Sequence, residues 1–555
     1  MMETVRIFCT NTQEYKDVPM GSRLEELIDV FGVKMDYLIT NAKVNNKTES
    51  LNYRVYQPKR VEYVDISNSS AMRTYVRSLC FILSKAVDDI LPNAKTYLEH
   101  AVAKGYYFQI IANEKVTAEK LDAIRNRMHE IVVANLPFQS IEEEKDKVAK
   151  LFHKNGMEDK ALLIETSDLL YARYFKLDNY VDYYYGCLTP STGYITMFDV
   201  MEYNGGFLLR VPKREDPVEL EPFVRQDKLL NVYKEHIKFL KISDLDNVGD
   251  LNKAKLDGHI SEVIQVAEAY QANQISDISE MITERVEKGL KLVLISGPSS
   301  SGKTTFRKRL EIQLYVDMLK PVGISLDNYF VDRDKTPLDE YGEKDYESLY
   351  SLDIDLFEKH LIELIKGQEI EMPTYNFTTG KREYKGNKLK MESNSVLIVE
   401  GIHALNPLLT NKIPRENKFM VYVSALTSLS LDSHNWIPAS DNRLLRRIVR
   451  DYRYRNYSAQ ETISRWDSVR RGEEKWIFPF QENADVMFNS AMLYELAALR
   501  RHAEPILMQV PRTVPEYSEA YRLLKFLGYF NYITDRELPP TSLLREFLGG
   551  SSFRY

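Results

Sequence analysis

The chain has 555 residues, which is too long for one hydrophobic core, so we expect three or four domains. Its 44% hydrophobic and 28% charged residues are typical of globular proteins, and no uninterrupted apolar stretch is long enough to cross a bilayer. A net charge of −7 excludes the overall electric field of a non-specific nucleic-acid binder.

The start of the chain and its cysteines point to the same compartment. Residues 1–6 contain no basic region followed by an apolar run, which argues against a secretory signal. Only Cys9, Cys80 and Cys187 occur, and they are too scattered for a disulfide framework or a zinc site. We therefore expect a cytoplasmic protein with no membrane attachment. The sequence is compatible with a homo-oligomer but specifies no oligomeric state.

The first half of the chain is predicted to hold two domains and a connector. Residues 1–66 read as a small α/β domain, with strands at 5–8 and 61–64 and a helix at 23–30. Residues 67–212 mix helical patterns with strand-like runs such as 106–110 and 206–212, which predicts an α+β domain. Residues 213–288 are mainly amphipathic helix and are predicted to form a helical connector.

In the second half, strand-like and helical runs alternate over residues 289–512, the pattern of a doubly wound parallel sheet. Residues 513–555 are predicted to form a last helix near 517–526 and a polar tail containing Pro539 and Pro540. The predicted fold class is thus multidomain, with α+β domains first and an α/β domain after them.

The strongest motif is a phosphate-binding loop. It fits G-x-x-x-x-G-K-[ST] and runs Gly297, Pro298, Ser299, Ser300, Ser301, Gly302, Lys303, Thr304, with Thr305 next to it. The glycines let backbone N–H groups point at phosphate oxygens, Lys303 reaches the outer phosphates, and the Thr304 hydroxyl can bind magnesium. The alternative, a chance serine–glycine loop, is disfavoured by the apolar strand at 292–295 and the helical spacing that follows. We expect ATP and magnesium as cofactors.

Two carboxylates follow strand-like runs in this half. Asp327 would lie at the carboxyl end of a strand, where it can accept the proton of an attacking hydroxyl or hold magnesium; a helix cap or loop Asp is the alternative. Glu400 ends the buried run 395–400 and can bind magnesium or its water, with an ordinary strand-end Glu as the alternative. His403 is assigned no role.

Residues 441–455 have the period of a helix with two faces. One side gathers the hydrophobic residues Leu444, Leu445, Ile448, Val449 and Tyr452, and the other gathers Arg443, Arg446, Arg447 and Arg450. Four guanidinium groups repel each other unless anions compensate, and phosphates suit the planar donor fork of Arg. The alternative is a solvated face paired with Asp441 and Asp451.

These segments resemble the uridine kinase and phosphoribulokinase family of P-loop kinases over residues 291–511. The family motifs are the phosphate loop, the D-x-F-Y-like segment 327–330, the P-x-Y-D-F-like segment 373–377, the E-G-I strand end at 400–402, and D-x-R-L-x-R-R-x-x-R-D, which is complete at 441–451. The resemblance implies transfer of the ATP γ-phosphate to an alcohol group of a nucleoside.

The same resemblance implies a role for each site residue. Asp327 would be the general base, and Lys303, Arg450 and Arg455 would neutralise phosphate charge. The residues implied in acceptor binding are Phe330, Glu347, Tyr375, Phe377 and Arg447. Magnesium would be held by Thr304 and Glu400.

Two positions depart from the uridine kinase pattern. A base-contacting histidine is replaced by Gly380, and the second Arg of an R-G-R segment is replaced by Tyr457. Because a site built around hydrogen bonds discriminates through them, the sequence favours kinase chemistry and leaves the acceptor base open. A sugar or sugar phosphate is the alternative acceptor.

The first half resembles the TGS module (1–66) and the second additional, editing domain (67–212) of threonyl-tRNA synthetases, mainly through residues 180–193. Editing domains need H-x-x-x-H on a helix plus a Cys and a His. Here those positions are Arg73, Arg77, Tyr184 and Leu188, so no metal or deacylation chemistry is expected.

We therefore predict a binding or regulatory role for the first half, with RNA or a nucleotide as its ligand, or a scaffold role. A second hypothesis for the whole chain is a nucleotide-dependent RNA-binding or regulatory protein in which the P-loop domain is a switch.

Overall fold

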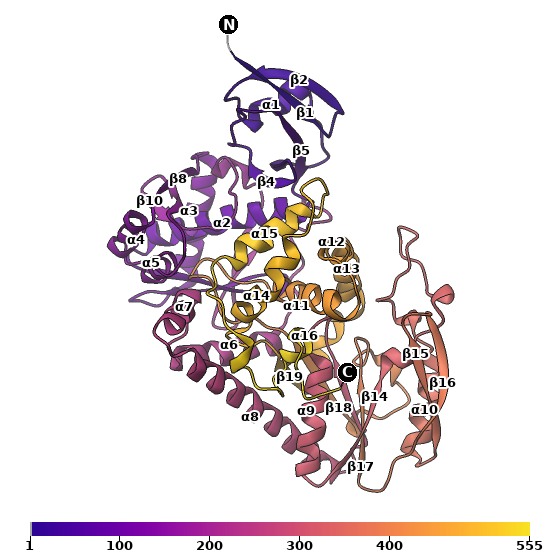
Figure 1. Cartoon of the computed structure of the whole chain (residues 1–555). Helices are drawn as coiled ribbons and strands as arrows, with labels where there is room; N and C mark the ends of the chain where they lie inside the picture. Colours follow the sequence, from indigo (N-terminus) through magenta and orange to yellow (C-terminus); the bar gives the residue numbers. More distant parts are fainter. Residues whose placement is uncertain (1–2, 555) are drawn as a thin grey trace.

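The computed structural model describes residues 3–554, and Figure 1 shows them as a chain of packed domains with the C-terminal segment, drawn in yellow, near the centre. Among these residues, no helix combines the length and apolar character needed to cross a membrane.

The N-terminal domain is a five-stranded sheet in the order β2-β1-β5-β3-β4. Its elements are β1 (Thr4–Cys9), β2 (Glu14–Pro19), α1 (Leu24–Phe31), β3 (Ile39–Val44), β4 (Lys47–Ser50) and β5 (Lys59–Asp65). Side chains alternate across β1, so Val5, Ile7 and Cys9 point to one face and are buried against Leu24 and Leu27 of α1. The two strands and the helix expected in this region are confirmed.

The next region has two antiparallel sheets, β11-β12-β7-β6 and β10-β9-β8. Its elements are α2 (Ser69–Ile90), β6 (Lys95–Val102), β7 (Gly105–Ile111), α3 (Ala118–Val133), β8 (Gln139–Glu144), α4 (Lys145–Lys154), α5 (Glu158–Glu165), β9 (Tyr171–Leu177), β10 (Tyr180–Asp182), β11 (Asp199–Tyr203) and β12 (Gly206–Arg210). Helix α2 begins where the Asn68 side chain accepts a hydrogen bond from the Ser70 N–H.

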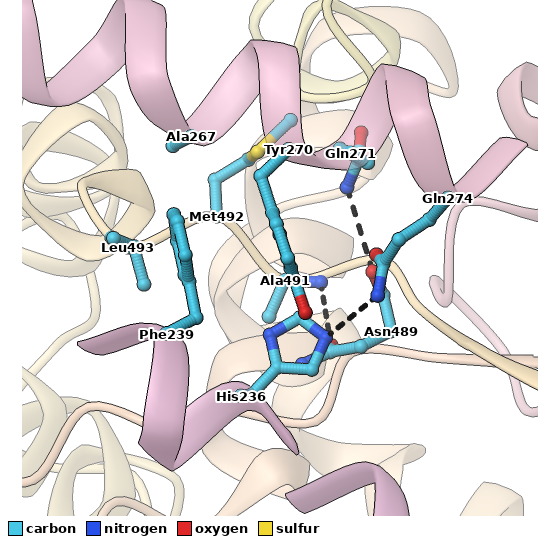
Figure 2. A pocket seen from close by; sticks show the side chains of 10 residues that line it. All are labelled: His236, Phe239, Ala267, Tyr270, Gln271, Gln274, Asn489, Ala491, Met492 and Leu493. Carbon is cyan, nitrogen blue, oxygen red and sulfur yellow. Dashed lines mark hydrogen bonds between the residues drawn. The ribbon is translucent and has the colours of Figure 1, made fainter. Parts of the chain in front are cut away.

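Three helices follow: α6 (Asp227–Ile242), α7 (Val248–Leu256) and the 27-residue α8 (Ile260–Val286). Helices α6 and α8 meet the segment after strand β19 (Val486–Asn489) at a small pocket, shown in Figure 2. There the Gln271 side-chain amide lies 3.5 Å from the Asn489 carbonyl oxygen, and Gln274 lies 3.5 Å from His236. The helical region is therefore packed directly on the last strand of the next sheet.

That next sheet is wholly parallel, in the order β14-β17-β13-β18-β19, which confirms the parallel sheet expected here. Its other strands are β13 (Leu292–Ser296), β14 (Lys320–Ser325), β17 (Ser395–Glu400) and β18 (Lys418–Ser424). Along β13, Leu292 and Leu294 pack in one hydrophobic cluster and Val293 and Ile295 in another. Both faces of the sheet are thus covered, as parallel sheets require.

Helices and a hairpin surround this sheet. They are α9 (Lys303–Val316), α10 (Ile354–Ile365), the hairpin β15 (Ile370–Asn376) and β16 (Lys381–Leu389), α11 (Ala439–Tyr454), α12 (Ala459–Ser464), α13 (Trp466–Trp476), α14 (Glu495–Leu507), α15 (Tyr517–Leu527) and α16 (Arg545–Leu548). The sheet order places the carboxyl ends of β13, β14 and β17 side by side, which brings the phosphate loop, Asp327 and Glu400 to one edge.

The expectation of a polar tail after α15 is wrong. Leu543, Leu544, Phe547 and Leu548 are almost fully buried, in the same hydrophobic cluster as Phe306 of α9. The pattern was missed because these apolar residues form only one short turn beyond a proline pair.

A buried ionic cluster joins the first half to the sheet domain. Lys160 Nζ lies 3.0 Å from Asp182 Oδ1 and 2.7 Å from Asp432 Oδ1, and His434 Nδ1 lies 2.6 Å from Asp182 Oδ2. All four side chains are at most 5% exposed. The cluster is therefore buried like a protein interior, although the Lys160–Asp432 and Asp182–His434 pairs join residues 272 and 252 positions apart in the chain.

Candidate active site

The phosphate-binding loop lies between β13 and α9. A Cβ atom on Gly297 would lie 1.9 Å from the Val423 carbonyl oxygen of β18, and Gly302 has φ +83°, so both positions need glycine. The Lys303 ammonium donates to the carbonyl oxygens of Gly297 and Pro298, at 2.9 and 3.1 Å. The loop thus needs glycine at both motif positions, and the Lys303 ammonium lies across its first residues.

Two arginines of α11 hold this loop from the protein interior. Arg443 is paired with Glu473 and donates to the Ser299 carbonyl oxygen at 3.1 Å. Arg446 is paired with Glu495 and donates to the Ser300 carbonyl oxygen at 3.3 Å.

The expectation of one cationic face with four arginines is therefore wrong for Arg443 and Arg446. They are 2% and 0% exposed, and buried glutamates neutralise them. Tyr452, expected on the packed side, is 44% exposed. The helical period itself is correct. Which arginines are buried depends on Glu473 and Glu495, which lie outside the helix and which its sequence pattern does not reveal.

Arg447, Arg450 and Arg455 share one carboxylate, that of Asp451. Their nearest nitrogens lie 3.3, 3.0 and 3.4 Å from its oxygens. Arg447 also donates to the Ser299 hydroxyl of the loop, at 2.8 Å. The proximity of Arg450, together with burial, lowers the pKa of Arg455 to about 10. Three cations with one anion leave an excess of positive charge beside the loop, which suits phosphate oxygens.

Thr304 and Glu400 lie together at the same edge of the sheet. The Thr304 hydroxyl is 3.3 and 3.4 Å from the two Glu400 carboxylate oxygens. Burial raises the pKa of Glu400, with Arg307 and Lys303 opposing the shift. A buried carboxylate beside a hydroxyl is a donor set that fits magnesium, which takes few protein oxygens and completes its shell with water and phosphate.

Asp327 lies in the short helical turn Leu326–Tyr329 directly after β14. Solvent reaches its side chain, but the protein around it displaces enough water to raise the pKa of its carboxyl. Lys303, Arg455 and Arg450 oppose this shift by their charges. The carboxylate therefore faces the same cations as the phosphates would.

The three aromatic residues implied in acceptor binding form one cluster. The ring centroids of Phe330 and Tyr375 lie 5.5 Å apart, those of Tyr375 and Phe377 5.1 Å, and those of Phe330 and Phe377 6.3 Å. Phe377 is 57% exposed. An exposed aromatic surface of this kind offers stacking area to a flat ligand.

Glu347 lies against α13, where a Cβ on Gly472 would come within 2.3 Å of the Glu347 Cβ. Burial raises the pKa of Glu347 to about 7, with Arg447 opposing and Glu473 adding to the shift. Its Oε2 atom and both ring nitrogens of His403 are buried without a hydrogen-bond partner in the part of the chain that the structure describes. Burial also lowers the pKa of His403 to about 4.

Gly380, at the position of the missing histidine, has φ +68° in the hairpin turn. A Cβ there would lie 2.7 Å from Arg333, whose N–H donates to the Gly380 carbonyl oxygen and whose guanidinium donates to that of Phe377. Arg333 therefore fills the space beside this turn. Tyr457, the second departure, lies under the guanidinium of Arg465.

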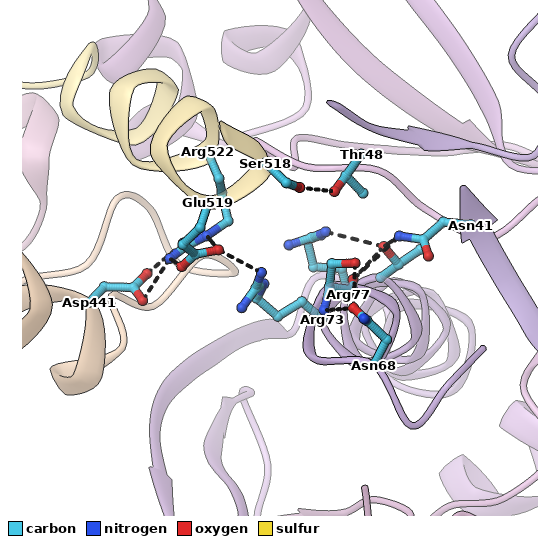
Figure 3. A network of polar contacts seen from close by, with 11 residues as sticks. Asn41, Thr48, Asn68, Arg73, Arg77, Asp441, Ser518, Glu519 and Arg522 are labelled. Atoms are coloured by element: carbon cyan, nitrogen blue, oxygen red, sulfur yellow. Dashed lines mark hydrogen bonds and ion pairs between the residues drawn. The ribbon is translucent and has the colours of Figure 1, made fainter. Parts of the chain in front are cut away.

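In the first half, Arg73 and Arg77 project from α2 toward α15, as Figure 3 shows. Arg73 lies 3.0 Å from Glu519, and Arg522, next to Glu519, forms a two-pronged pair with Asp441 of α11. Arg77 donates to the Cys187 carbonyl oxygen at 3.1 Å. Arg73 thus connects the first half, through Glu519 and Arg522, to the helix that carries the phosphate-site arginines, whereas Arg77 bonds within the first half.

Sequence reasoning missed three residues beside the site: Arg333, Glu473 and Glu546. Glu473 accepts hydrogen bonds from Arg443 and from the Ser299 N–H, and Glu546 accepts from Thr305. Neither glutamate belongs to a motif, and only the folded chain brings them to the loop.

Residues 292–496 match the family described as "Phosphoribulokinase / Uridine kinase family". Uridine kinase from Halobacterium salinarum is 28% identical over 195 residues, which are 35% of this chain and 77% of that protein. Uridine kinase from Staphylococcus haemolyticus is 29% identical over 198 residues, 35% of this chain and 86% of that protein. The solved structure of a possible uridine kinase from Bacillus stearothermophilus aligns at 17% identity with 39% of this chain and 100% of its own, with a TM-score of 0.26. Residues 292–496, which carry the phosphate-binding loop, are a domain of the phosphoribulokinase and uridine kinase family.

Proposed function

We propose that the chain is an ATP-dependent kinase that transfers the γ-phosphate of ATP to a hydroxyl group of a small molecule, a nucleoside. The observation that carries the proposal is the placement of Asp327. Its carboxylate is reached by solvent and interacts electrostatically with Lys303 of the phosphate loop and with Arg450 and Arg455. A carboxylate base, a phosphate loop and guanidinium groups that outnumber their one carboxylate partner, all at one sheet edge, suit phosphoryl transfer to a hydroxyl.

In this reaction the acceptor oxygen attacks the γ-phosphorus, and the bond to the β–γ bridging oxygen breaks. The products are a phosphate ester and ADP, and the hydroxyl proton passes to a carboxylate oxygen of Asp327. The raised pKa of Asp327 makes it a better proton acceptor than an ordinary Asp. Lys303, Arg450 and Arg455 neutralise phosphate charge, and magnesium at Thr304 and Glu400 would supply further neutralisation.

The acceptor would lie between the aromatic cluster and Glu347. The cluster offers stacking to a base, and the unpartnered Glu347 oxygen can accept a hydrogen bond from a sugar hydroxyl. The side chain next to the Gly380 turn is a guanidinium, so the base contact of uridine kinases is replaced by a donor group. Because this contact differs, the acceptors to test include sugars and sugar phosphates as well as pyrimidine nucleosides.

The test is an ATP-consumption panel over nucleosides, sugars and sugar phosphates with the purified full chain, followed by mass identification of the product. A product heavier than one acceptor by a single phosphoryl group supports the proposal. ATP hydrolysis at the same rate with every acceptor, and no phosphorylated product, would contradict it and favour a nucleotide-dependent switch.

We also propose that the first half is a TGS-like and editing-like pair of domains with a binding or regulatory role. This is supported by the engagement of Arg73 with Glu519 in the chain of ion pairs that ends at Asp441. Retention of a labelled transfer RNA by the full-length protein would support an RNA ligand. No retention at micromolar protein would favour the scaffold role.

A further inference from the structure

The C-terminal segment is in direct contact with the phosphate-binding loop. Glu546 of α16 accepts two hydrogen bonds with one carboxylate oxygen, from the Thr305 N–H at 3.2 Å and from the Thr305 hydroxyl at 2.6 Å. Leu543 lies against Gly302, where a Cβ would come within 2.5 Å of its Cδ2 atom. The segment thus covers both the last glycine of the loop and the first turn of α9.

The Thr305 N–H belongs to the donor groups that are predicted to bind phosphate. Helix α9 begins at Lys303, and its first intrahelical bond runs from the Phe306 N–H to the Gly302 carbonyl oxygen. The Thr305 N–H therefore precedes the first intrahelical bond, as the last of the N-terminal donors that turn outward from the helix. Such donors, with the positive end of the helix dipole, hold the inner phosphates of a nucleotide in a P-loop.

Glu546 resembles a phosphate group in what it presents to this helix. It is a partly buried carboxyl group, and no salt bridge to it occurs among residues 3–554. It instead interacts with a helix N-terminus, an environment that stabilises carboxylates and phosphates alike. The apolar neighbours Leu543, Leu544 and Phe547 are 0% exposed and anchor the segment, so the carboxylate is held in place by the protein interior.

We propose that Glu546 is an intramolecular competitor of the nucleotide, which occupies the inner-phosphate donors of the loop until the triphosphate displaces its carboxylate. This inference rests on the proposed ATP-dependent function. The displacement needs only a rotation of the Glu546 side chain, because the buried anchors can stay in place. The C-terminal segment then weakens ATP binding, by an amount that depends on the contact between Glu546 and Thr305.

The test compares the affinity of the full chain for magnesium ATP, without acceptor, in wild type and in Glu546→Gln by titration calorimetry. The neutral amide can still accept a hydrogen bond but loses the charge, so we expect ATP to bind roughly tenfold more tightly to the variant. Glu537→Gln is the matched control, since Glu537 lies in the same segment but accepts its hydrogen bond from Ser261 of α8. The Glu537→Gln variant should bind magnesium ATP with the affinity of wild type.

Thermal melting gives a second measurement. Without nucleotide, Glu546→Gln should melt below wild type because it lost a charge-assisted bond. At the same saturating ATP concentration, ATP should stabilise the variant by about 1.4 kcal/mol more than it stabilises wild type, the equivalent of a tenfold change in affinity. A structural role alone would lower the melting temperature without changing the gain.

Each outcome decides the question. Equal or weaker ATP binding by Glu546→Gln overturns the inference and leaves the kinase proposal standing. Tighter binding with no phosphorylated product from any acceptor supports the inference and contradicts the kinase proposal. No ATP binding by either protein overturns both.

Discussion

Arg446 connects the phosphate-binding loop to the interior, and replacing it tests how the loop is held. Its guanidinium is fully buried and paired with Glu495, with one contact at 2.7 Å. It also donates to Ser490, at 3.2 Å to the hydroxyl and 2.9 Å to the carbonyl oxygen, and to the Ser300 carbonyl oxygen. The perturbation is Arg446→Met, which keeps much of the side-chain volume and removes every donor.

The expected loss is about 3–5 kcal/mol in the free energy of unfolding, because the substitution leaves the Glu495 carboxylate buried without its cation. The Met492 N–H, 3.0 Å from Glu495 Oε2, would remain as a hydrogen-bond partner of this carboxylate. We therefore expect a loss near the lower end of that range. Removing both charges in Arg446→Met/Glu495→Met should recover most of this loss, since a buried pair and a hydrophobic pair of similar volume are often close in stability.

ATP affinity should behave differently from stability. The Ser300 carbonyl oxygen loses its donor in both the single and the double variant, so both should bind magnesium ATP more weakly even where stability is restored. The assay is urea unfolding followed by circular dichroism, with the first transition compared, and ATP titration at a temperature where all variants are folded. Arg453→Met is the control, because Arg453 lies on the exposed side of the same helix and should change stability by less than about 1 kcal/mol.

An Arg446→Met protein that unfolds within about 0.5 kcal/mol of wild type would contradict this prediction, and so would a double variant as unstable as the single one. Either result would mean that the buried pair does not carry the energy that its geometry implies.

Three further predictions concern the site itself. Asp327→Asn should lower kcat by about 100-fold or more while ATP affinity stays near wild type, because it removes the proton acceptor but no phosphate ligand; unchanged turnover on the true acceptor would exclude the residue as base. Thr304→Val should raise the magnesium concentration needed for half-maximal activity, and an unchanged titration curve would contradict the assignment of its hydroxyl. Glu347 has a folded pKa of about 7, above its unfolded value, so the folded protein binds more protons and loses stability as pH rises from about 4.5 to 7. Wild type should therefore lose more of its free energy of unfolding than Glu347→Gln between pH 5 and pH 8, by about 1–2 kcal/mol in urea unfolding. A difference between the two proteins that is the same at both pH values would refute this.

The sequence predicts the site best where the chemistry is local. The phosphate loop, the parallel strand β13 and the strand-end positions of Asp327 and Glu400 depend on neighbours in the chain, and all lie where their motifs place them. The arginine helix shows the limit of this kind of reasoning. Its period separates two faces but cannot tell that Glu473 and Glu495, some 30 and 49 residues away, make two of its arginines interior.

The C-terminal segment shows the limit more sharply. Residues 543–548 have too few positions to display a period, and their burial depends on a surface made by α9 and α11, which end at Val316 and Tyr454. The same is true of Arg333. It occupies the space that a side chain at position 380 would need, because the hairpin folds back on the segment after β14. Long-range packing decided these positions, and no short sequence window contains it.

The Lys160 cluster bears on how this protein can be divided. A kinase-family fragment beginning after residue 212 would keep Asp432 and His434 but lose Lys160 and Asp182, which are their ionic partners. It would also expose apolar side chains of the sheet domain that now share a core with Tyr107 and Leu208. The two halves are thus interdependent parts of one molecule, so exchanging one half between related proteins would require changing the buried charges of the other as well.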